Sequence, residues 1–283
     1  MCSSDSTPPI GAQALFLHAN GFPSGTYRQF LAALGKHMVV HAPEVIHTPR
    51  STRATRRWPE MTDQVMKQAS SLAGSSTPLV LVGHSMGGYL SLIAAARLGK
   101  QVAAVVLIDS PMVISWRRPF LEVLKFAKLT NFAGPAPIAA RRRDQWASAR
   151  EAYDHLSPKA FTRDWAPGVL DDFIEHGLVK AGSAGVALRI AREIERDIYA
   201  RLPAQRTLSS LKRLRSQGVP VFMIAGKQSV ETEMAGRDGN RHLFQERWLE
   251  LPSGHLVPME LPGQCADAVA RFVGTVTGQG AGS

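Results

Sequence analysis

Short apolar runs recur along the chain, and most of them stop at glycine or at polar residues. Runs of this kind, about four to eight residues long and rich in valine, leucine and isoleucine, are typical of strands buried on both faces of a sheet. They predict strands at residues 14–18, 38–43, 79–83, 102–109, 219–226 and 247–251.

Amphipathic segments separate these runs. Apolar side chains at helical spacing predict helices at residues 26–34, 59–72, 89–96 and 259–273, and Gly274 is a plausible stop for the last one. Strands that alternate with helices indicate a parallel sheet covered by helices. The fold class we expect is therefore α/β, with a mostly parallel, doubly wound sheet.

The alternation stops between residues 111 and 217, where no convincing buried strand is visible and helices are favoured instead. The expected helical segments lie near residues 120–129, 138–155, 168–176 and 191–202. A helical cap inserted into the sheet domain explains this change of pattern. We expect an α/β core at residues 10–110 and 218–278, a cap at 111–217, and flexible termini at 1–9 and 279–283.

Composition narrows the class of protein further. The chain has 283 residues, 45% of them hydrophobic, which is enough for one large core and an inserted subdomain. Cys2 and Cys265 are too few for a disulfide framework and favour a reducing compartment. No secretory signal and no apolar run long enough to cross a bilayer are visible, so we expect a cytoplasmic protein without a membrane partner.

The chain is basic, with 33 Lys and Arg against 23 Asp and Glu and a formal charge of +10. Arginines cluster at residues 50–57, 117–118 and 141–143. No basic run is interleaved with stacking aromatics, so we expect a solvated surface and no nucleic-acid partner. Attraction of an anionic ester substrate is the weaker alternative, and the sequence does not give the oligomeric state.

The sequence Gly83-His84-Ser85-Met86-Gly87 follows a predicted strand and precedes a predicted helix. This Gly-x-Ser-x-Gly pattern is typical of a nucleophile elbow, a strained turn that lifts a serine hydroxyl clear of the sheet. Such a turn leaves no room for side chains on either flank, which explains both glycines. We expect Ser85 to be a nucleophile and His84 to pack within the turn.

A second candidate lies in the loop after the last predicted strand. His255, in the sequence Ser253-Gly254-His255-Leu256, can reach the carboxyl edge of the sheet and act as general base for Ser85. A third stretch, His18-Ala19-Asn20-Gly21-Phe22, follows the first strand and resembles a His-Gly oxyanion loop. We expect the backbone N–H groups of Met86 and Asn20, or alternatively Phe22, to bind an oxyanion.

These stretches together resemble the α/β-hydrolase-fold serine hydrolases that carry a cap, and are similar to uncharacterised bacterial members. The order serine, acid, histidine along the chain also matches that family. The family usually places its acid shortly after the strand that ends here at Gly226, but Ser229 occupies that position. The antiparallel strands that often open the fold are missing or reduced to residues 10–13.

Two acids could replace the missing one. Asp109 ends a strand, where some haloalkane dehalogenases keep their acid, whereas Glu231 or Glu233 could reach from the usual loop. We favour Asp109 over Glu231, because a strand end positions a side chain more tightly than a loop does. A purely structural role for Asp109, satisfied by loop N–H groups, is the competing interpretation.

A serine at the elbow argues for transfer of an acyl group to water, because relatives that open epoxides or displace halide carry aspartate there. We therefore expect a serine esterase acting on an ester, lactone or thioester with an apolar acyl group. Carbon–carbon hydrolysis, a hydroxynitrile-lyase-type reaction and a non-catalytic ligand-binding homologue are the alternatives. No cofactor is expected, and His41 and His47 lack partners at metal-ligand spacing.

The residues expected to line the substrate pocket come from the loops around the site and from the cap. For the cap aromatics, packing in the cap core is an equally good interpretation. The expected pocket residues are His18, Phe22, His84, Trp116, Phe120, Trp146, Trp165 and Leu256.

Overall fold

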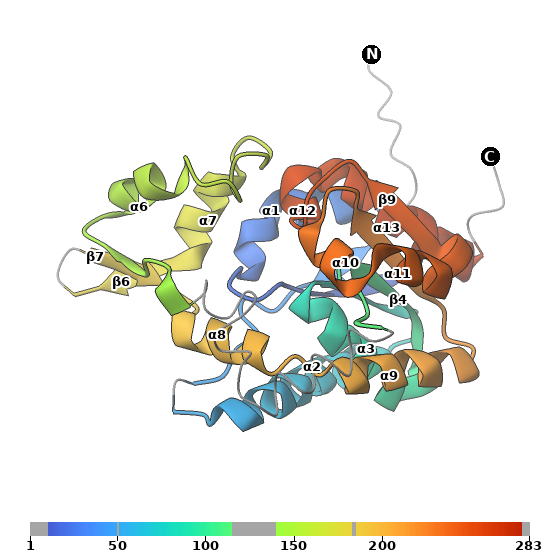
Figure 1. Cartoon of the computed structure of the whole chain (residues 1–283). Helices are drawn as coiled ribbons and strands as arrows, with labels where there is room; N and C mark the ends of the chain where they lie inside the picture. Colours follow the sequence, from blue (N-terminus) through green and yellow to red (C-terminus); the bar gives the residue numbers. More distant parts are fainter. Residues whose placement is uncertain (1–10, 50, 115–139, 183–184, 279–283) are drawn as a thin grey trace, which may run out of the picture.

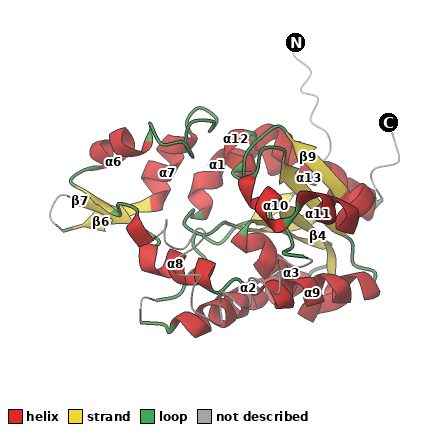
Figure 2. Cartoon of the chain, viewed as in Figure 1, coloured by secondary structure: helices red, strands yellow, loops and turns green. Residues whose placement is uncertain are grey.

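A parallel sheet forms the centre of the molecule (Figures 1 and 2). The structure is a computed structural model and describes residues 11–49, 51–114, 140–182 and 185–278. Within these residues the main sheet has six strands in the order β2-β1-β3-β4-β8-β9, and every neighbouring pair is parallel. The strands are β1 (Gln13–Leu17), β2 (Val39–His41), β3 (Leu79–His84), β4 (Val102–Ile108), β8 (Val221–Gly226) and β9 (Trp248–Leu251). The predicted fold class and strands are confirmed.

Helices cover both faces of this sheet, because alternate strand residues point to opposite sides and both sides are apolar. Helices α1 (Arg28–Leu34) and α13 (Pro262–Thr277) pack on one face. Helices α2 (Arg57–Ala73), α3 (Met86–Leu98) and α9 (Ala204–Ser216) pack on the other. The sequence assigned α9 to the inserted segment, but its buried Leu211 and Leu214 join the core beneath the sheet.

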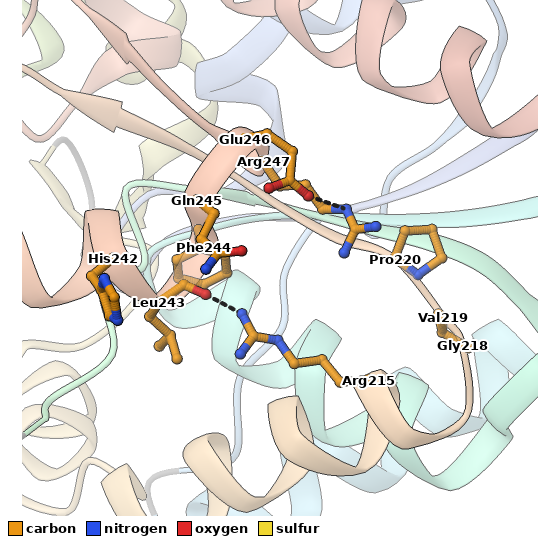
Figure 3. A pocket seen from close by; sticks show the side chains of 10 residues that line it. All are labelled: Arg215, Gly218, Val219, Pro220, His242, Leu243, Phe244, Gln245, Glu246 and Arg247. Atoms are coloured by element: carbon orange, nitrogen blue, oxygen red, sulfur yellow. Dashed lines mark hydrogen bonds and ion pairs between the residues drawn. The ribbon is translucent and has the colours of Figure 1, made fainter.

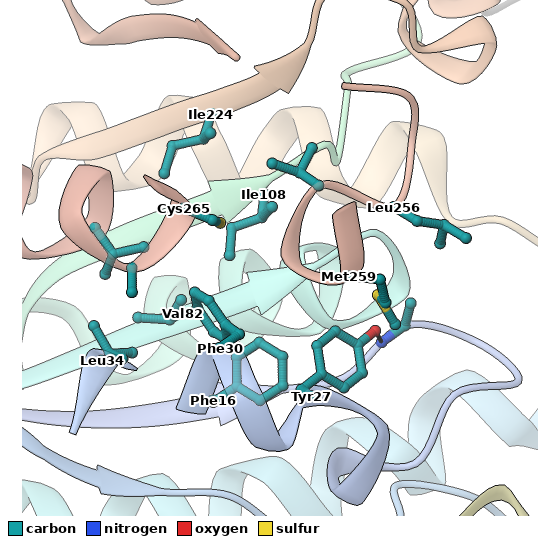
Figure 4. Packing of buried hydrophobic residues seen from close by; sticks show 14 of the residues in the cluster. Phe16, Tyr27, Phe30, Leu34, Val82, Ile108, Ile224, Leu256, Met259 and Cys265 are labelled. Atoms are coloured by element: carbon teal, nitrogen blue, oxygen red, sulfur yellow. Dashed lines mark hydrogen bonds between the residues drawn. The ribbon is translucent and has the colours of Figure 1, made fainter. Parts of the chain in front are cut away.

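Figure 4 shows the core between the sheet and helices α1 and α13. Phe16 of β1 lies against Tyr27 and Phe30, with ring centroids 4.8 Å and 5.3 Å apart. Cys265 of α13 belongs to the same cluster and is fully buried. This packing fixes the sheet and the segments that follow its strands as one layered body.

The segment between β4 and α9 is not purely helical. It contains helices α6 (Ala149–Leu156), α7 (Val169–Gly177) and α8 (Arg192–Ala200), together with a small antiparallel sheet. That sheet has the order β5-β7-β6, with strands β5 (Gln145–Trp146), β6 (Leu178–Ala181) and β7 (Gly185–Leu188). The sequence predicted helices without a convincing buried strand here, and the small sheet adds to those helices. These strands are two to four residues long and only partly buried, so they leave no apolar run in the sequence.

Several element ends differ from their predicted positions. Helix α13 continues through Gly274 to Thr277 and ends at Gly278, which is left-handed with φ +78°. A single glycine is tolerated inside a helix at modest cost, so Gly274 was a poor stop signal. The remaining elements are short: η1 (Ser24–Tyr27), η2 (Ala54–Arg56), η3 (Gly99–Gln101), α10 (Val230–Ala235), α11 (Arg237–Phe244), η5 (Gln245–Arg247) and α12 (Val257–Glu260).

Two arginines of the basic clusters are structural rather than solvated. Arg57 is 3% exposed, bonds to Thr48 and pairs with Asp197 of α8 at 3.0 Å, which ties α8 to α2. Arg142 pairs with Glu195 of α8 at 2.8 Å. The expectation of a solvated surface is wrong for these two residues. Among the helices described, none is both long and apolar enough to cross a membrane.

Candidate active site

The serine elbow lies directly between β3 and α3. Ser85 has φ 51° and ψ −114°, a conformation that costs a non-glycine residue energy and occurs mainly at functional sites. Its N–H donates to the carbonyl of Ile108 at 2.9 Å, which holds the turn against β4. Ser85 is partly exposed at the carboxyl end of the sheet, where the N-terminus of α3 begins at Met86.

The two glycines that flank Ser85 sit where no side chain fits. A Cβ at Gly83 would lie 2.3 Å from the carbonyl carbon of Gly87, and a Cβ at Gly87 would lie 1.9 Å from the Leu17 oxygen. Gly88 is equally restricted, because a Cβ added there would lie 2.1 Å from Ser110 Oγ. The close approach of α3 to the end of β3, to β1 and to Ser110 therefore depends on glycine at these three positions.

His255 and Asp109 meet Ser85 from two other loops. His255 Nε2 lies 3.1 Å from Ser85 Oγ, and His255 Nδ1 lies 2.6 Å from Asp109 Oδ2. A proton on Nδ1 that is donated to Asp109 leaves Nε2 free to accept the serine hydroxyl proton. The structure thus brings together the serine, the histidine and the strand-end aspartate that the sequence singled out.

Asp109 is fully buried and accepts hydrogen bonds on both carboxylate oxygens. Besides His255, its donors are the hydroxyls of Ser229 (2.5 Å) and Thr232 (3.0 Å) and the N–H of Gly226 (2.8 Å). Ser229 and Thr232 were not identified from the sequence. The available signal was Ser229 itself, a hydroxyl residue at the position where an acid was expected.

Glu231 lies on the outer side of the same histidine. Its Oε2 is 3.8 Å from His255 Nδ1, and its side chain is 52% exposed, so it makes the weaker contact. Among the described residues, Asp109, Glu231 and His255 form one group of potential metal ligands, with donor atoms within 4.8 Å of one another. An ion there would replace the Nδ1–Asp109 hydrogen bond, so this donor set fits an orienting acid better than a ligand set.

The charges at the site have clear physical causes. Burial opposes ionisation of Asp109, but hydrogen bonds from His255, Ser229 and Gly226 hold the pKa of its carboxyl below the usual value. Burial alone would lower the pKa of His255, but the hydrogen bond and charge of Asp109, with Glu231 and Glu260, raise it above the usual value. An ionised acid therefore stabilises the protonated form of the imidazole.

The candidate oxyanion loop, residues 18–23, is held by buried contacts. His18 Nδ1 donates to the Ala19 carbonyl at 2.8 Å, and Nε2 accepts the N–H of Ile46 at 2.6 Å. Burial lowers the pKa of His18 to about 4, so the ring stays neutral. The side-chain amide of Asn20 donates to the Glu195 carbonyl at 2.9 Å, and the Phe22 N–H donates to Ala19 at 3.3 Å.

A chain of buried hydrogen bonds joins this loop to the elbow and to the His255 loop. The Ala19 N–H donates to Tyr27 Oη at 2.9 Å, and the Tyr27 hydroxyl donates to His84 Nδ1 at 2.8 Å. His84 Nε2 then donates to the His255 carbonyl at 2.9 Å. Burial lowers the pKa of His84 to about 3, which keeps the neutral ring that this donor order requires. Sequence reasoning missed Tyr27.

The predicted pocket residues fall into three groups. His18 and His84 are fully buried with both ring nitrogens bonded to protein atoms, so neither presents a surface to a substrate. Trp146, Trp165 and Leu256 are at most 8% exposed and belong to the apolar core, which favours the packing interpretation for the two tryptophans. Trp116 and Phe120 lie outside the described residues.

Phe22 remains partly exposed on the candidate oxyanion loop. Its ring lies 6.1 Å from that of Trp165 and 5.8 Å from that of Phe173 of α7. This aromatic group joins the loop to the inserted segment.

An ion pair from the insertion also reaches this loop. A Cβ at Gly21 would lie 3.1 Å from the carboxyl group of Glu195, which is 5% exposed and pairs with Arg142. Burial raises the pKa of Glu195, and Arg142 opposes that shift. Gly21 has φ +83°, so its lack of a side chain serves both the turn and the approach of α8.

The fold and the site together define the family. Residues 14–270 match the model of the alpha/beta hydrolase family, and the chain belongs to that family. The match covers the elbow, the candidate acid and the His255 loop.

Known proteins with similar sequences or structures include several hydrolases. Lipase LipV of Mycobacterium tuberculosis is 26% identical over 206 residues, which cover 70% of this chain and 69% of the lipase. The peroxisomal alpha-beta-hydrolase Lpx1 of Saccharomyces cerevisiae superposes with a TM-score of 0.68 at 18% identity, covering 93% of this chain and 77% of Lpx1. E-2-(acetamidomethylene)succinate hydrolase gives a TM-score of 0.69 at 18% identity, covering 93% and 91%. The structural likenesses concern the fold.

Proposed function

We propose that this chain is a serine hydrolase that cleaves a carboxylic ester, or a related lactone or thioester, through an acyl-enzyme on Ser85. The observation that carries the proposal is the 3.1 Å separation of Ser85 Oγ and His255 Nε2, with Asp109 bonded to the other ring nitrogen at 2.6 Å. This is the geometry of an activated serine nucleophile. The similarity to a lipase adds support.

In the first half-reaction, His255 takes the hydroxyl proton of Ser85 while Ser85 Oγ attacks the substrate carbonyl. Asp109 holds the imidazole in the required tautomer and stabilises its protonated form. The imidazolium then gives its proton to the leaving alcohol, and the ester bond breaks. In the second half-reaction, His255 activates a water that hydrolyses the acyl-enzyme and restores Ser85.

The carbonyl oxygen gains negative charge during each attack, and two backbone N–H groups bind it. One is that of Met86, the first residue of α3, whose N-terminal N–H groups have no partner within the helix. The other is that of Asn20. The Phe22 N–H already donates to Ala19, which favours Asn20 over Phe22 as the second donor.

The same three residues could also serve carbon–carbon hydrolysis or a lyase reaction, and a complete triad weighs against a role restricted to ligand binding. A panel of 4-nitrophenyl esters from acetate to decanoate tests the proposal. The wild type should release nitrophenol with at least one ester, and Ser85→Ala and His255→Ala should each lose more than about 10³-fold in kcat. Ester turnover that survives in both variants would overturn it, and so would the absence of turnover with every ester of the panel.

A further inference from the structure

A cavity of about 510 Å³ lies at the edge of the sheet opposite Ser85 (Figure 3). Its walls come from the end of α9, from residues 218–220 that lead into β8, and from residues 242–247 that lead into β9. Ser85 follows the carboxyl end of β3, whereas these segments precede the amino ends of parallel strands. The cavity is therefore separate from the candidate active site.

Two guanidinium groups dominate the polar lining of this cavity. Arg215 approaches from α9, and one of its N–H groups donates to the Leu243 carbonyl, which fixes it at the cavity. In the described part of the chain Arg215 forms no ion pair. Arg247 pairs with its neighbour Glu246 at 4.0 Å, a weak pair because the Glu246 side chain is 73% exposed. Its guanidinium carbon also lies 5.9 Å from the centroid of the Phe222 ring. The lining thus carries two cations and one loosely held anion.

The two arginines are close enough to repel one another. Burial lowers the pKa of the Arg215 guanidinium, the charge of Arg247 lowers it further, and Glu246 opposes these effects. A bound anion between the two groups would remove this repulsion. Each arginine also has further N–H donors for bidentate contacts to an anion.

A second feature of the cavity is a strained residue. Among the described residues, Ser85, Asp109 and Gln245 are the non-glycine residues with positive φ. The first two belong to the candidate triad, and Gln245, with φ 51° and ψ −125°, lines this cavity. Strained backbone of this kind is concentrated at active and binding sites.

The volume of the cavity and the apolar part of its lining indicate which kind of anion it can bind. The volume falls within the range of about 300–1,000 Å³ that is usual for small-molecule sites and is far larger than one phosphate needs. Val219 and Phe244, 4% and 3% exposed, form an apolar part of the lining. We propose that the cavity binds a small phosphate monoester, with its phosphate between Arg215 and Arg247 and its organic part against this wall.

Titration calorimetry with adenosine 5′-monophosphate, at constant ionic strength, tests the proposal. The wild type should bind it with a dissociation constant below about 1 mM. Arg215→Gln and Arg247→Gln should each weaken binding about tenfold or more, since each removes charge-assisted hydrogen bonds. Arg206→Gln, on the exposed side of α9 and outside the cavity, should leave the affinity unchanged.

Adenosine and orthophosphate separate the two parts of the ligand. Adenosine should bind at least about tenfold more weakly than the monophosphate, and orthophosphate should bind weakly but with the same dependence on both arginines. Unchanged affinity in the Arg215→Gln, Arg247→Gln double variant would overturn the site, as would no binding by the wild type at 10 mM. Orthophosphate that binds as tightly as the monophosphate would overturn the monoester assignment. Thermal unfolding of each variant verifies that it is folded.

Discussion

His84 donates a hydrogen bond from Nε2 to the backbone carbonyl of His255 at 2.9 Å, which joins the elbow to the loop of the candidate base. The ring centroids of the two histidines lie 5.1 Å apart. Through Tyr27, the same chain of hydrogen bonds continues to Ala19 in the candidate oxyanion loop. Three loops from distant parts of the sequence are thus held in fixed positions relative to one another by one series of buried hydrogen bonds.

Removal of the Tyr27 hydroxyl tests this chain. Tyr27→Phe leaves His84 Nδ1 and the Ala19 N–H buried without partners, which should cost about 1–3 kcal/mol of unfolding free energy. We also expect kcat for an ester to fall about tenfold, because small displacements of catalytic groups are costly. Urea unfolding and steady-state kinetics measure both effects.

Tyr153→Phe is the matched control, since the Tyr153 ring lies near Arg150 on α6 and takes no part in these hydrogen bonds. This variant should have the unfolding free energy and the kcat of the wild type, within experimental error. A Tyr27→Phe variant with unchanged kcat would mean that the chain does not position the site.

The role of Asp109 as the triad acid can be tested by transferring its carboxylate to position 229. Asp109→Asn should lower kcat by about 10³–10⁴-fold, because an amide neither orients nor stabilises the imidazolium as a carboxylate does. Ser229 Oγ is 2.5 Å from Asp109 Oδ2, so a carboxylate at position 229 can approach His255 Nδ1. The double variant Asp109→Asn, Ser229→Asp should therefore recover at least about tenfold over Asp109→Asn.

Two comparisons make this result interpretable. Asp109→Asn with Ser229→Asn changes the volume in the same way without the charge and should show no recovery. Full activity in Asp109→Asn, combined with loss in Glu231→Gln, would assign the acid to Glu231 instead.

Glu231 should affect the pH dependence of kcat/KM. Its carboxylate raises the pKa of His255, so Glu231→Gln should lower that pKa. His255 acts as base in its neutral form, and therefore the acidic limb of the kcat/KM profile should move to lower pH. Glu233→Gln is the control, because Glu233 lies on the same helix α10, is exposed and pairs with Arg237 at 3.1 Å. A shift towards higher pH, or an equal shift in both variants, would contradict this account.

The glycines of the elbow should differ sharply in their tolerance. A Cβ at Gly87 would lie 1.9 Å from the Leu17 carbonyl oxygen, so Gly87→Ala should destabilise the fold by about 3 kcal/mol or more. Gly263, at the start of α13, has open space around it, and Gly263→Ala should be neutral or slightly stabilising. Urea denaturation distinguishes the two. Equal stability of both variants would mean that the close packing of α3 on β1 is wrong.

Local signals predicted much of the fold and part of the site. The elbow was visible because its strand, glycines and serine are contiguous in sequence. Asp109 was found because it ends a buried apolar run, and strands end at one edge of a parallel sheet. These inferences depend on chemistry within a few residues.

Features that depend on distant pairs were not predictable in this way. Tyr27 and His84 are 57 residues apart, and nothing near Tyr27 marks its hydroxyl as a bridge. The strands of the inserted segment were missed because they are short and half-exposed, so no periodic apolar pattern distinguishes them. Arg57 and Arg142 were taken for surface residues because their carboxylate partners lie more than 50 positions away.

Covalent labelling with a fluorophosphonate, followed by mass spectrometry of the intact protein and of its peptides, tests most directly whether Ser85 is an activated nucleophile. We expect a single adduct on Ser85, lost in Ser85→Ala and formed far more slowly in His255→Ala. An unlabelled wild type, or an adduct on another residue, would contradict this expectation.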